Sequence, residues 1–223
     1  DRLFVFPRGS QPGIEPELLR PAVRGRDVGA YGITDPELDI LVPYTYDGAG
    51  NAALIDLRAF PGAARFLNRH RVDLRERHCV RVWEKAWFDL HDSPSVDLAK
   101  QVKILVPDVA NSNRFAVDEG HYFPLHSVYY LVPRAGVDPY FLVGLLNSDL
   151  AAFFVRVFSP LVKDGFNRYR QQFLSEIPIP LVTDAEQLAI AEAARVGDAE
   201  LVNERVRALF RLSCHAGERA GLG

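Results

Sequence analysis

The segment from Pro139 to Val157 constrains the fold of this chain more than any other part of the sequence. Proline is suited to the first turn of a helix, and apolar residues then occupy nearly every face of the helix that would follow. A helix that is apolar on all sides has to be buried. We therefore predict a core helix over residues 139–157, which Ser159-Pro160 brings to an end.

Shorter elements are expected on either side of this helix. Strand-like segments, bounded by Pro, Asn or Gly, occur at 3–6, 40–44, 102–106, 114–117 and 127–132, and a turn at 47–51 returns the chain into 53–57. Further helices are predicted from Pro61 to about residue 70, at 169–175, and from Asp184 to Leu209 with a break near Gly197. The fold class that we predict is α+β, with a mixed β-sheet and C-terminal helices.

Length and composition limit the class of protein. The chain has 223 residues, 48% of them hydrophobic, which is enough for one sizeable core. No apolar run approaches the roughly 18 residues of a membrane span, and two cysteines suggest no disulfide framework, so a cytoplasmic location is expected. Methionine is absent, even at position 1. We therefore expect this sequence to be a piece of a longer protein.

Charge is distributed unevenly along the chain. The net charge is −3, which by itself argues against a nucleic-acid binder. Residues 58–85, however, contain eight Arg or Lys against three Asp or Glu, whereas residues 31–57 contain five acids and no Arg or Lys. An acidic chain can still present a basic face to a polyanion. The alternative is that residues 58–85 form a solvated helix surface.

Motifs that would make this chain an enzyme are missing. An amino-methyltransferase carries N/D-P-P-Y/F/W, and this sequence has no Pro-Pro pair. No lysine has Asp or Glu two positions before it, as a D/E-x-K nuclease requires, and no two histidines are spaced i, i+4. The aromatic cluster Trp83, Trp87 and Phe88 is predicted to be core, and the alternative is that it stacks on a flipped base. We expect no catalytic residue, no metal ligand and no cofactor in this chain, and so no enzyme activity from it alone.

An ordered series of segments resembles one family. The series includes Leu19–Val28 with its Arg-Gly-Arg-Asp, Lys103–Ala110, Leu142–Ser148, Asn167–Arg170 and Ile177–Pro180. It resembles the C-terminal specificity (target-recognition) domain of TaqI-like and Eco57I-like adenine-N6 DNA methyltransferases, of the type IIG restriction-modification or BREX phage-defence kind. The resemblance extends over about residues 15–180.

That resemblance implies a division of labour. In such families an N-terminal part transfers a methyl group from S-adenosylmethionine to adenine N6, and the C-terminal part clamps the duplex and reads bases. This chain is similar to the second part only. The implied partners are double-stranded DNA and the methyltransferase domain of the same parent chain, and S-adenosylmethionine is expected for the parent enzyme. We expect a DNA target-recognition domain at 1–180 and a C-terminal helical segment at 181–223.

Twelve residues are candidates for DNA contact. Arginine can grip phosphate or a guanine edge, asparagine can pair with adenine, and an aromatic ring can stack on a base. For each group the alternative is an ordinary surface turn or a packed helix end. The candidates are Arg24, Arg26, Arg69, Arg71, Arg75, Lys103, Asn111, Asn113, Arg114, Arg168, Tyr169 and Arg170.

Two rival functions remain open at this stage. The Leu-Leu-Asn-Ser and Ile-Pro-Ile-Pro segments are also similar to type I specificity subunits, which read DNA for separate methyltransferase subunits. A protein-interaction module of a defence system that never touches DNA is the second rival.

Overall fold

The computed structural model describes residues 2–10, 12–162 and 165–211 and confirms the predicted α+β class. The chain forms two compact units. Unit 1 comprises Asp1–Asp27, Thr34–Val102 and Asp118–Val128, and unit 2 comprises Val28–Ile33, Lys103–Val117 and Tyr129–Gly223. A division at residue 180 does not coincide with these units, because the last two helices pack inside unit 2.

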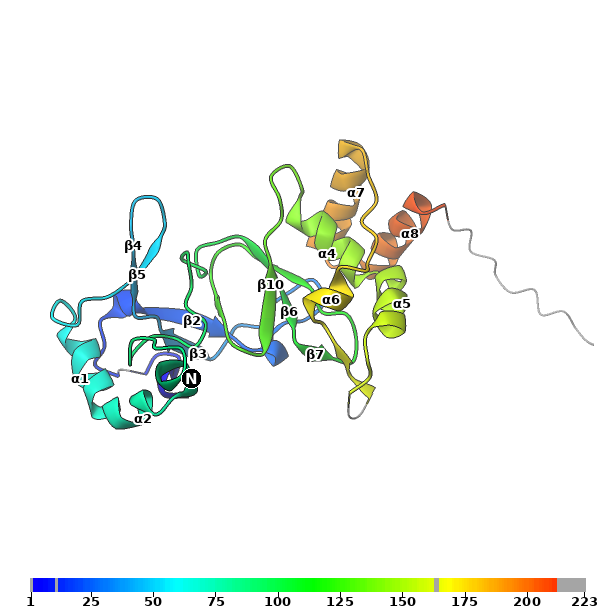
Figure 1. Cartoon of the computed structure of the whole chain (residues 1–223). Coiled ribbons are helices and arrows are strands. Elements are labelled where there is room, and N and C mark those ends of the chain that lie inside the picture. Colours follow the sequence, from blue (N-terminus) through cyan, green and yellow to red (C-terminus); the bar gives the residue numbers. More distant parts are fainter. Residues whose placement is uncertain (1, 11, 163–164, 212–223) are drawn as a thin grey trace, which may run out of the picture. The chain divides into compact units, whose positions relative to one another are not determined.

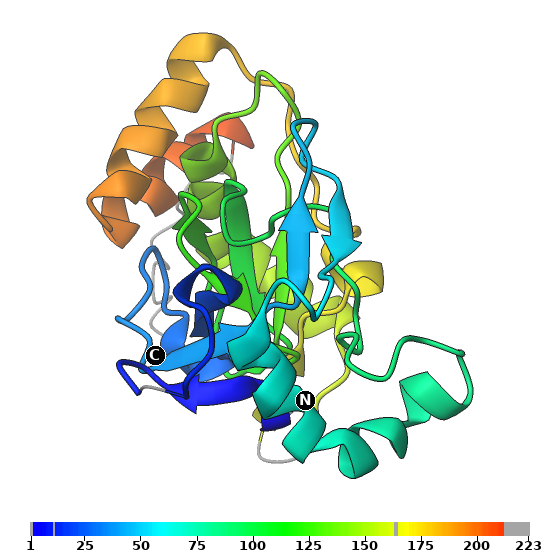
Figure 2. The ribbon, with the colours of Figure 1, turned by 90° about the vertical axis from the view of Figure 1, so that its left-hand side faces the viewer.

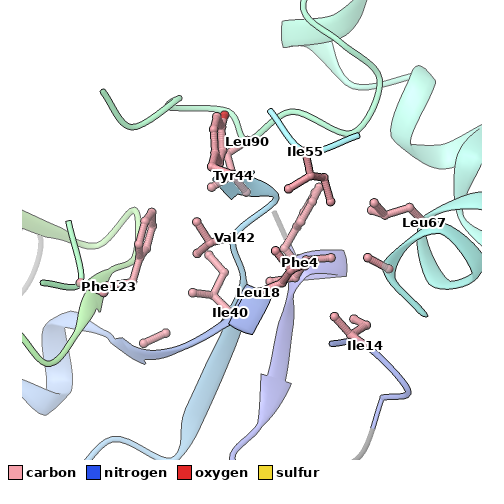
Figure 3. Close-up of a cluster of buried hydrophobic side chains, with 14 of the residues drawn as sticks. Phe4, Ile14, Leu18, Ile40, Val42, Tyr44, Ile55, Leu67, Leu90 and Phe123 are labelled. Carbon is pink, nitrogen blue, oxygen red and sulfur yellow. The ribbon is translucent and has the colours of Figure 1, made fainter. Parts of the chain in front are cut away.

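A four-stranded sheet organises unit 1. Its order is β1-β3-β2-β9, and all neighbours are antiparallel except β2 and β9, where Ala22 pairs with Phe123. The strands are β1 (Val5–Pro7), β2 (Leu19–Val23), β3 (Leu38–Leu41) and β9 (Phe123–Pro124). Short 3-10 turns η1 (Arg2–Phe4), η2 (Pro16–Leu18) and η3 (Gly25–Asp27) flank β1 and β2. Figure 3 shows the core that this sheet builds with Phe4, Leu18 and Val42.

The predicted hairpin is present, with shifted ends. Pro43 interrupts the expected strand 40–44, so β3 ends at Leu41 and the hairpin consists of β4 (Tyr44–Tyr46) and β5 (Ala52–Leu54). The Asp47 carboxylate accepts hydrogen bonds from the amides of Ala49 and Asn51 and closes the turn.

Three consecutive helices follow the hairpin: α1 (Pro61–Arg69), α2 (Arg71–Arg75) and α3 (His78–Arg81) (Figure 2). Leu67 of α1 points into the core of unit 1 (Figure 3), and Leu74 of α2 is buried there too. The start of α1 is held by the Glu15 carboxylate, which accepts hydrogen bonds from the amides of Gly62 (2.6 Å) and Ala63 (2.9 Å). A Cβ at Gly62 would lie 2.3 Å from the Gly13 carbonyl oxygen, so this approach requires glycine.

Unit 2 has a small mixed framework of strands. A three-stranded sheet has the order β10-β6-β8, and a separate pair joins β11 to β7. The strands are β6 (Lys103–Pro107), β7 (Val109–Ala110), β8 (Ala116–Asp118), β10 (Val128–Leu131) and β11 (Asn167–Arg168). Every residue of β6 is buried.

The predicted core helix is two helices. It breaks at Ser148 into α4 (Pro139–Asn147) and α5 (Asp149–Phe158), which are bent by 65°. The Ser148 side chain accepts a hydrogen bond from the amide of Ala151 and so caps α5. Competition of a serine side chain for backbone groups explains why apolar periodicity alone missed the break. In the described ranges no single helix is long and apolar enough to cross a membrane, although this bent pair passes such a test on length and composition.

Two more helices cover α4: α7 (Asp184–Arg195) and α8 (Ala199–Leu209) (Figure 1). Their break near Gly197 was predicted, and Thr183 and Glu186 form a capping box at the start of α7. A Cβ at Gly144 would lie 2.6 Å from Ile190 Cγ2, so α4 and α7 pack closely at this glycine. The helix predicted at 169–175 is only α6 (Gln171–Leu174).

We expect Glu15→Gln to destabilise the chain in a pH-dependent way. Burial alone would raise the pKa of the Glu15 carboxyl, but the amides of Gly62 and Ala63 hold that pKa below its ordinary value of 4.5. A depressed pKa gives stability that is present above the ordinary value and is lost as pH falls through the folded-state pKa. Urea denaturation at pH 7 should show a loss of about 1 kcal/mol in the free energy of unfolding.

The difference in the free energy of unfolding between the unmodified chain and Glu15→Gln should shrink once pH falls below 4.5. Glu17→Gln, which changes an exposed acid on η2, serves as the control and should behave as the unmodified chain does. An equal loss at about pH 3 would show that the charge of Glu15 is not the cause.

Candidate nucleic-acid interface

The loop Asn111–Arg114 follows the two-residue strand β7, and its side chains are divided between surface and core. Asn111 is exposed, and its Oδ1 accepts a hydrogen bond from Arg114 Nη2 at 3.2 Å. Asn113 is buried, and its Nδ2 donates to the Leu146 carbonyl at 2.6 Å. The loop therefore presents Asn111 and Arg114 outward, while Asn113 anchors it from below.

The second predicted group lies beside this loop. Strand β11 pairs antiparallel with β7, so that Arg168 faces Val109 and Asn167 faces Ala110. Arg168 Nη1 lies 3.6 Å from Asp108 Oδ2, and Ser159 Oγ bonds to both the amide and the carbonyl of Arg168. The pairing brings two groups of candidate residues, more than 50 positions apart in sequence, onto one edge of unit 2.

Tyr169 joins the two groups from inside the unit. It is buried against Phe115, with ring centroids 5.9 Å apart, and its hydroxyl donates to Asn113 Oδ1 at 3.0 Å. Burial raises the pKa of Tyr169 to about 12, although Arg114 and Arg156 act to lower it. The hydroxyl therefore remains protonated and available as a donor at neutral pH.

Three of the twelve candidates need correction as surface groups. Lys103 is fully buried in β6, and Asn113 and Tyr169 are buried as described above. The polar atoms of Asn113 and Tyr169 make hydrogen bonds inside unit 2, as buried polar atoms in folded proteins do. These three residues were predicted to be at the surface because polar side chains usually are, and their neighbours in sequence include many amides and bases.

Within unit 1, Arg24 and Arg26 differ in how they are engaged. Arg24 Nε lies 3.2 Å from Asp27 Oδ2, and the side chain of Arg24 is only 24% exposed. Arg26 is 67% exposed and 3.8 Å from the same carboxylate. The amide of Gly25 donates to Ser127 Oγ, which fixes this turn. Arg26 is consequently the more accessible of the two.

The basic segment of unit 1 is partly surface and partly support. Arg69, Arg71 and Arg75 are exposed on α1 and α2, and Arg65 and Arg69 line a shallow hollow with Ala64 and Asn68. Arg77 instead donates to the carbonyls of Trp87 and Asp89. Lys85 donates to the carbonyls of Leu90 and His91. Charge counting could not distinguish these two uses of a cation.

Trp83 lies on the surface, contrary to the prediction for it. We predicted it to be core, but it is 50% exposed, whereas Trp87 and Phe88 are partly covered by the core of unit 1. Within the ranges that the structure describes, no three His, Cys, Asp or Glu side chains lie close enough to hold a metal ion.

Comparison with known proteins now decides the family. Residues 20–179 match the family model described as the TaqI-like C-terminal specificity domain. The chain belongs to this family. The predicted resemblance to a TaqI-like specificity domain over residues 15–180 is thereby confirmed for residues 20–179.

Relatives of this specificity domain are type II methyltransferases. It is 30% identical over 203 residues to M.XhoI of Xanthomonas vasicola, and this alignment covers 90% of this chain and 36% of that protein. It is 26% identical over 217 residues to M.BstVI of Geobacillus stearothermophilus, which covers 96% of this chain and 37% of that protein. The chain thus spans little more than a third of the length of these relatives.

A solved structure shares the fold of the specificity domain. The type IIL restriction-modification enzyme MmeI, solved in complex with DNA, superposes with a TM-score of 0.65 at 13% identity. The match covers 96% of this chain and 32% of that one. At this identity the likeness concerns the fold.

We expect Tyr169→Phe to destabilise the specificity domain by about 1–3 kcal/mol, because Asn113 Oδ1 would lose a buried donor. Tyr130→Phe is the matched control, since Tyr130 is 42% exposed, and it should change the free energy of unfolding by less than about 0.5 kcal/mol. Urea denaturation measures both. Equal stability of the two variants would show that the Tyr169–Asn113 hydrogen bond does not hold the loops.

Proposed function

We propose that this chain is the sequence-specific DNA recognition domain of a site-specific adenine-N6 DNA methyltransferase in a restriction-modification or phage-defence system. One observation carries the proposal: in a chain of the TaqI-like specificity family, the loops 111–114 and 167–170 lie together on a strand pair. Asn and Arg side chains on a fixed support can match the donor and acceptor pattern of a base edge in the major groove.

Each accessible candidate has a role in this proposal. Asn111 and Arg114 are placed to contact base edges, and Arg168 and Arg170 to contact phosphate or a base. Asn113 and Tyr169 position them from the core. In unit 1 the exposed arginines are suited to contact phosphate: Arg26, Arg69, Arg71 and Arg75. Phosphate contacts carry no sequence information, but they set the register of the protein on the duplex.

The parent protein, on this proposal, supplies the chemistry. Its methyltransferase domain would bind S-adenosylmethionine and transfer the methyl group to adenine N6, while residues 1–180 select the site. The names of the relatives, type II methyltransferases, support a methyltransferase parent. Adenine as the target base rests on the TaqI-like resemblance. Within the segment 181–223, helices α7 and α8 pack against α4, and we propose that they support the recognition region; residues 212–223 lie outside the described residues.

Selection from a random duplex library tests the proposal directly. The chain, immobilised at low salt, should enrich one short sequence motif over several rounds and bind the enriched duplex more tightly than a shuffled one. A protein that binds DNA without sequence preference is expected to have a Kd of about 10⁻⁴ to 10⁻⁶ M at physiological salt. Failure to enrich any motif, together with the absence of any salt-dependent affinity for DNA, would favour the interaction module that never contacts DNA.

Replacing Arg69, Arg71 and Arg75 together with Ala should weaken binding to all sequences alike. Loss of phosphate contacts reduces counterion release, so a plot of log K against log salt should flatten by about one unit per contact. Arg207→Ala is the control, because Arg207 is ion-paired to Asp149 on unit 2. An unchanged slope in the triple variant would mean that these bases are only solvated surface.

Arg114→Ala should act on sequence preference instead. If Arg114 contacts one base edge, its loss should cost about 1–3 kcal/mol at one position of the selected motif and relax the preference there only. Ser112→Ala, in the same exposed loop, is the matched control. Repeating the selection with each variant distinguishes the outcomes. A uniform loss across all sequences would assign Arg114 to phosphate and transfer base reading to Arg168 and Arg170.

A further inference from the structure

Trp83 forms a small aromatic patch on the surface of unit 1. Its ring centroid lies 5.4 Å from that of His78, at 87°, and 5.0 Å from that of His91, at 52°. His78 begins α3, and Trp83 and His91 belong to the segment that follows α3. The indole is nevertheless half exposed. Two imidazoles therefore brace the indole ring while much of its surface stays open to solvent.

The segment that carries Trp83 is held from several sides. The amide of Lys85 donates to the Cys79 carbonyl, and Lys85 Nζ donates to the carbonyls of Leu90 and His91 and to Ser93 Oγ at 2.7 Å. The Asp89 carboxylate accepts from Ser93 Oγ and from the hydroxyl of Tyr44. The cations Lys85 and Arg77 thus bind backbone carbonyls between Trp87 and His91, in the part of the segment that follows Trp83.

Backbone geometry beside Trp83 supports the same conclusion. Glu84 has a φ of +55°, a left-handed conformation that is uncommon for a residue other than glycine. Such a conformation persists where surrounding contacts over-determine it, and it occurs often at ligand-contact sites. A side chain that is fixed in advance loses little conformational entropy when a ligand covers it.

The charges around this ring indicate the chemistry of its ligand. Arg81, two positions before Trp83, is 65% exposed and lies 3.1 Å from the Glu76 carboxylate, and the preceding helices carry the exposed arginines Arg69, Arg71 and Arg75. An exposed π surface in a unit that also carries several exposed arginines suits a ligand that combines aromatic faces with negative charge. Nucleic acid has both, because every base offers a π face and every nucleotide a phosphate.

We propose that Trp83 stacks on the face of a nucleobase in bound DNA, with His78 and His91 holding the indole in place. The inference rests on the proposed function, since it requires this chain to bind DNA. A base face becomes accessible in a duplex either at an unpaired nucleotide or where a side chain opens a base step. Both sources offer the same stacking surface to Trp83.

Tryptophan fluorescence tests the contact, because the chain has two tryptophans. In Trp87→Phe the remaining emission is that of Trp83. It should be quenched as the motif-selected duplex is added, in step with the anisotropy of labelled DNA. In Trp83→Phe, where Trp87 alone emits, DNA should leave the emission unchanged. A closed hairpin duplex, with and without one bulged nucleotide, identifies the source: quenching by both forms indicates an opened step, and by the bulged form alone an unpaired base.

Affinity provides an independent measure. Trp83→Ala should weaken DNA binding by about 5-fold to 150-fold, whereas Trp83→Phe, which keeps a ring, should retain most of the affinity. Val72→Ala is the control, since Val72 is an exposed apolar residue of the same basic segment, and it should bind as the unmodified chain does.

Two results would overturn the inference. Salt-dependent DNA binding that saturates without quenching Trp83, or that survives Trp83→Ala unchanged, would refute stacking and leave the proposed DNA recognition standing. Complete absence of DNA binding by the folded chain, as judged by circular dichroism, would refute both. If a protein partner instead protected Trp83 while DNA did not, the patch would be a protein contact.

Discussion

The side-chain amide of Asn113 is the contact on which the surface loops of unit 2 depend. It donates to the Leu146 carbonyl at the end of α4 and accepts from the Tyr169 hydroxyl, so it links the buried helix to both candidate loops. A nearby amide repeats the arrangement, since Asn147 accepts from the amide of Phe115 and donates to its carbonyl. Because Asn113 is buried and Asn147 is partly buried, their polar atoms would be costly to leave unpaired. The hydrogen bonds to α4 thereby fix the position of the residues proposed to contact bases.

In unit 1 the cations perform two different tasks. Arg77 and Lys85 bind backbone carbonyls and shape the segment that carries Trp83, and Arg24 is held by Asp27. These side chains are committed to contacts inside the fold and are not placed to grip a phosphate. Residues 58–85 therefore offer fewer side chains for phosphate contact than their composition suggests. Such a binding surface depends on a few exposed arginines, while the buried or partly buried bases stabilise the backbone that carries them.

Sequence periodicity located most elements because burial dictates it. The α+β class, the helix from Pro61 and the break near Gly197 followed from apolar spacing and from turn residues. The break at Ser148 did not, because a capping hydroxyl overrode a continuous apolar pattern. Burial of Lys103 and exposure of Trp83 were also missed, since a charged and an aromatic residue each suggest the opposite position by type alone. The residue types of the candidate interface could be identified, but which ones point outward required the register of β7 and β11.

A recognition domain with net negative charge has a physical advantage if specificity matters more than affinity. Phosphate contacts attract all sequences equally, and the many competing sites of a genome penalise a protein that binds them well. Several arginines here are paired with carboxylates, among them Arg195 with Asp138 and Arg207 with Asp149. Pairing lowers the affinity for any duplex without touching contacts to base edges. On the proposed function, the ratio of specific to non-specific binding therefore depends on the loops around Asn113, and the acidic balance of the chain helps to keep that ratio high.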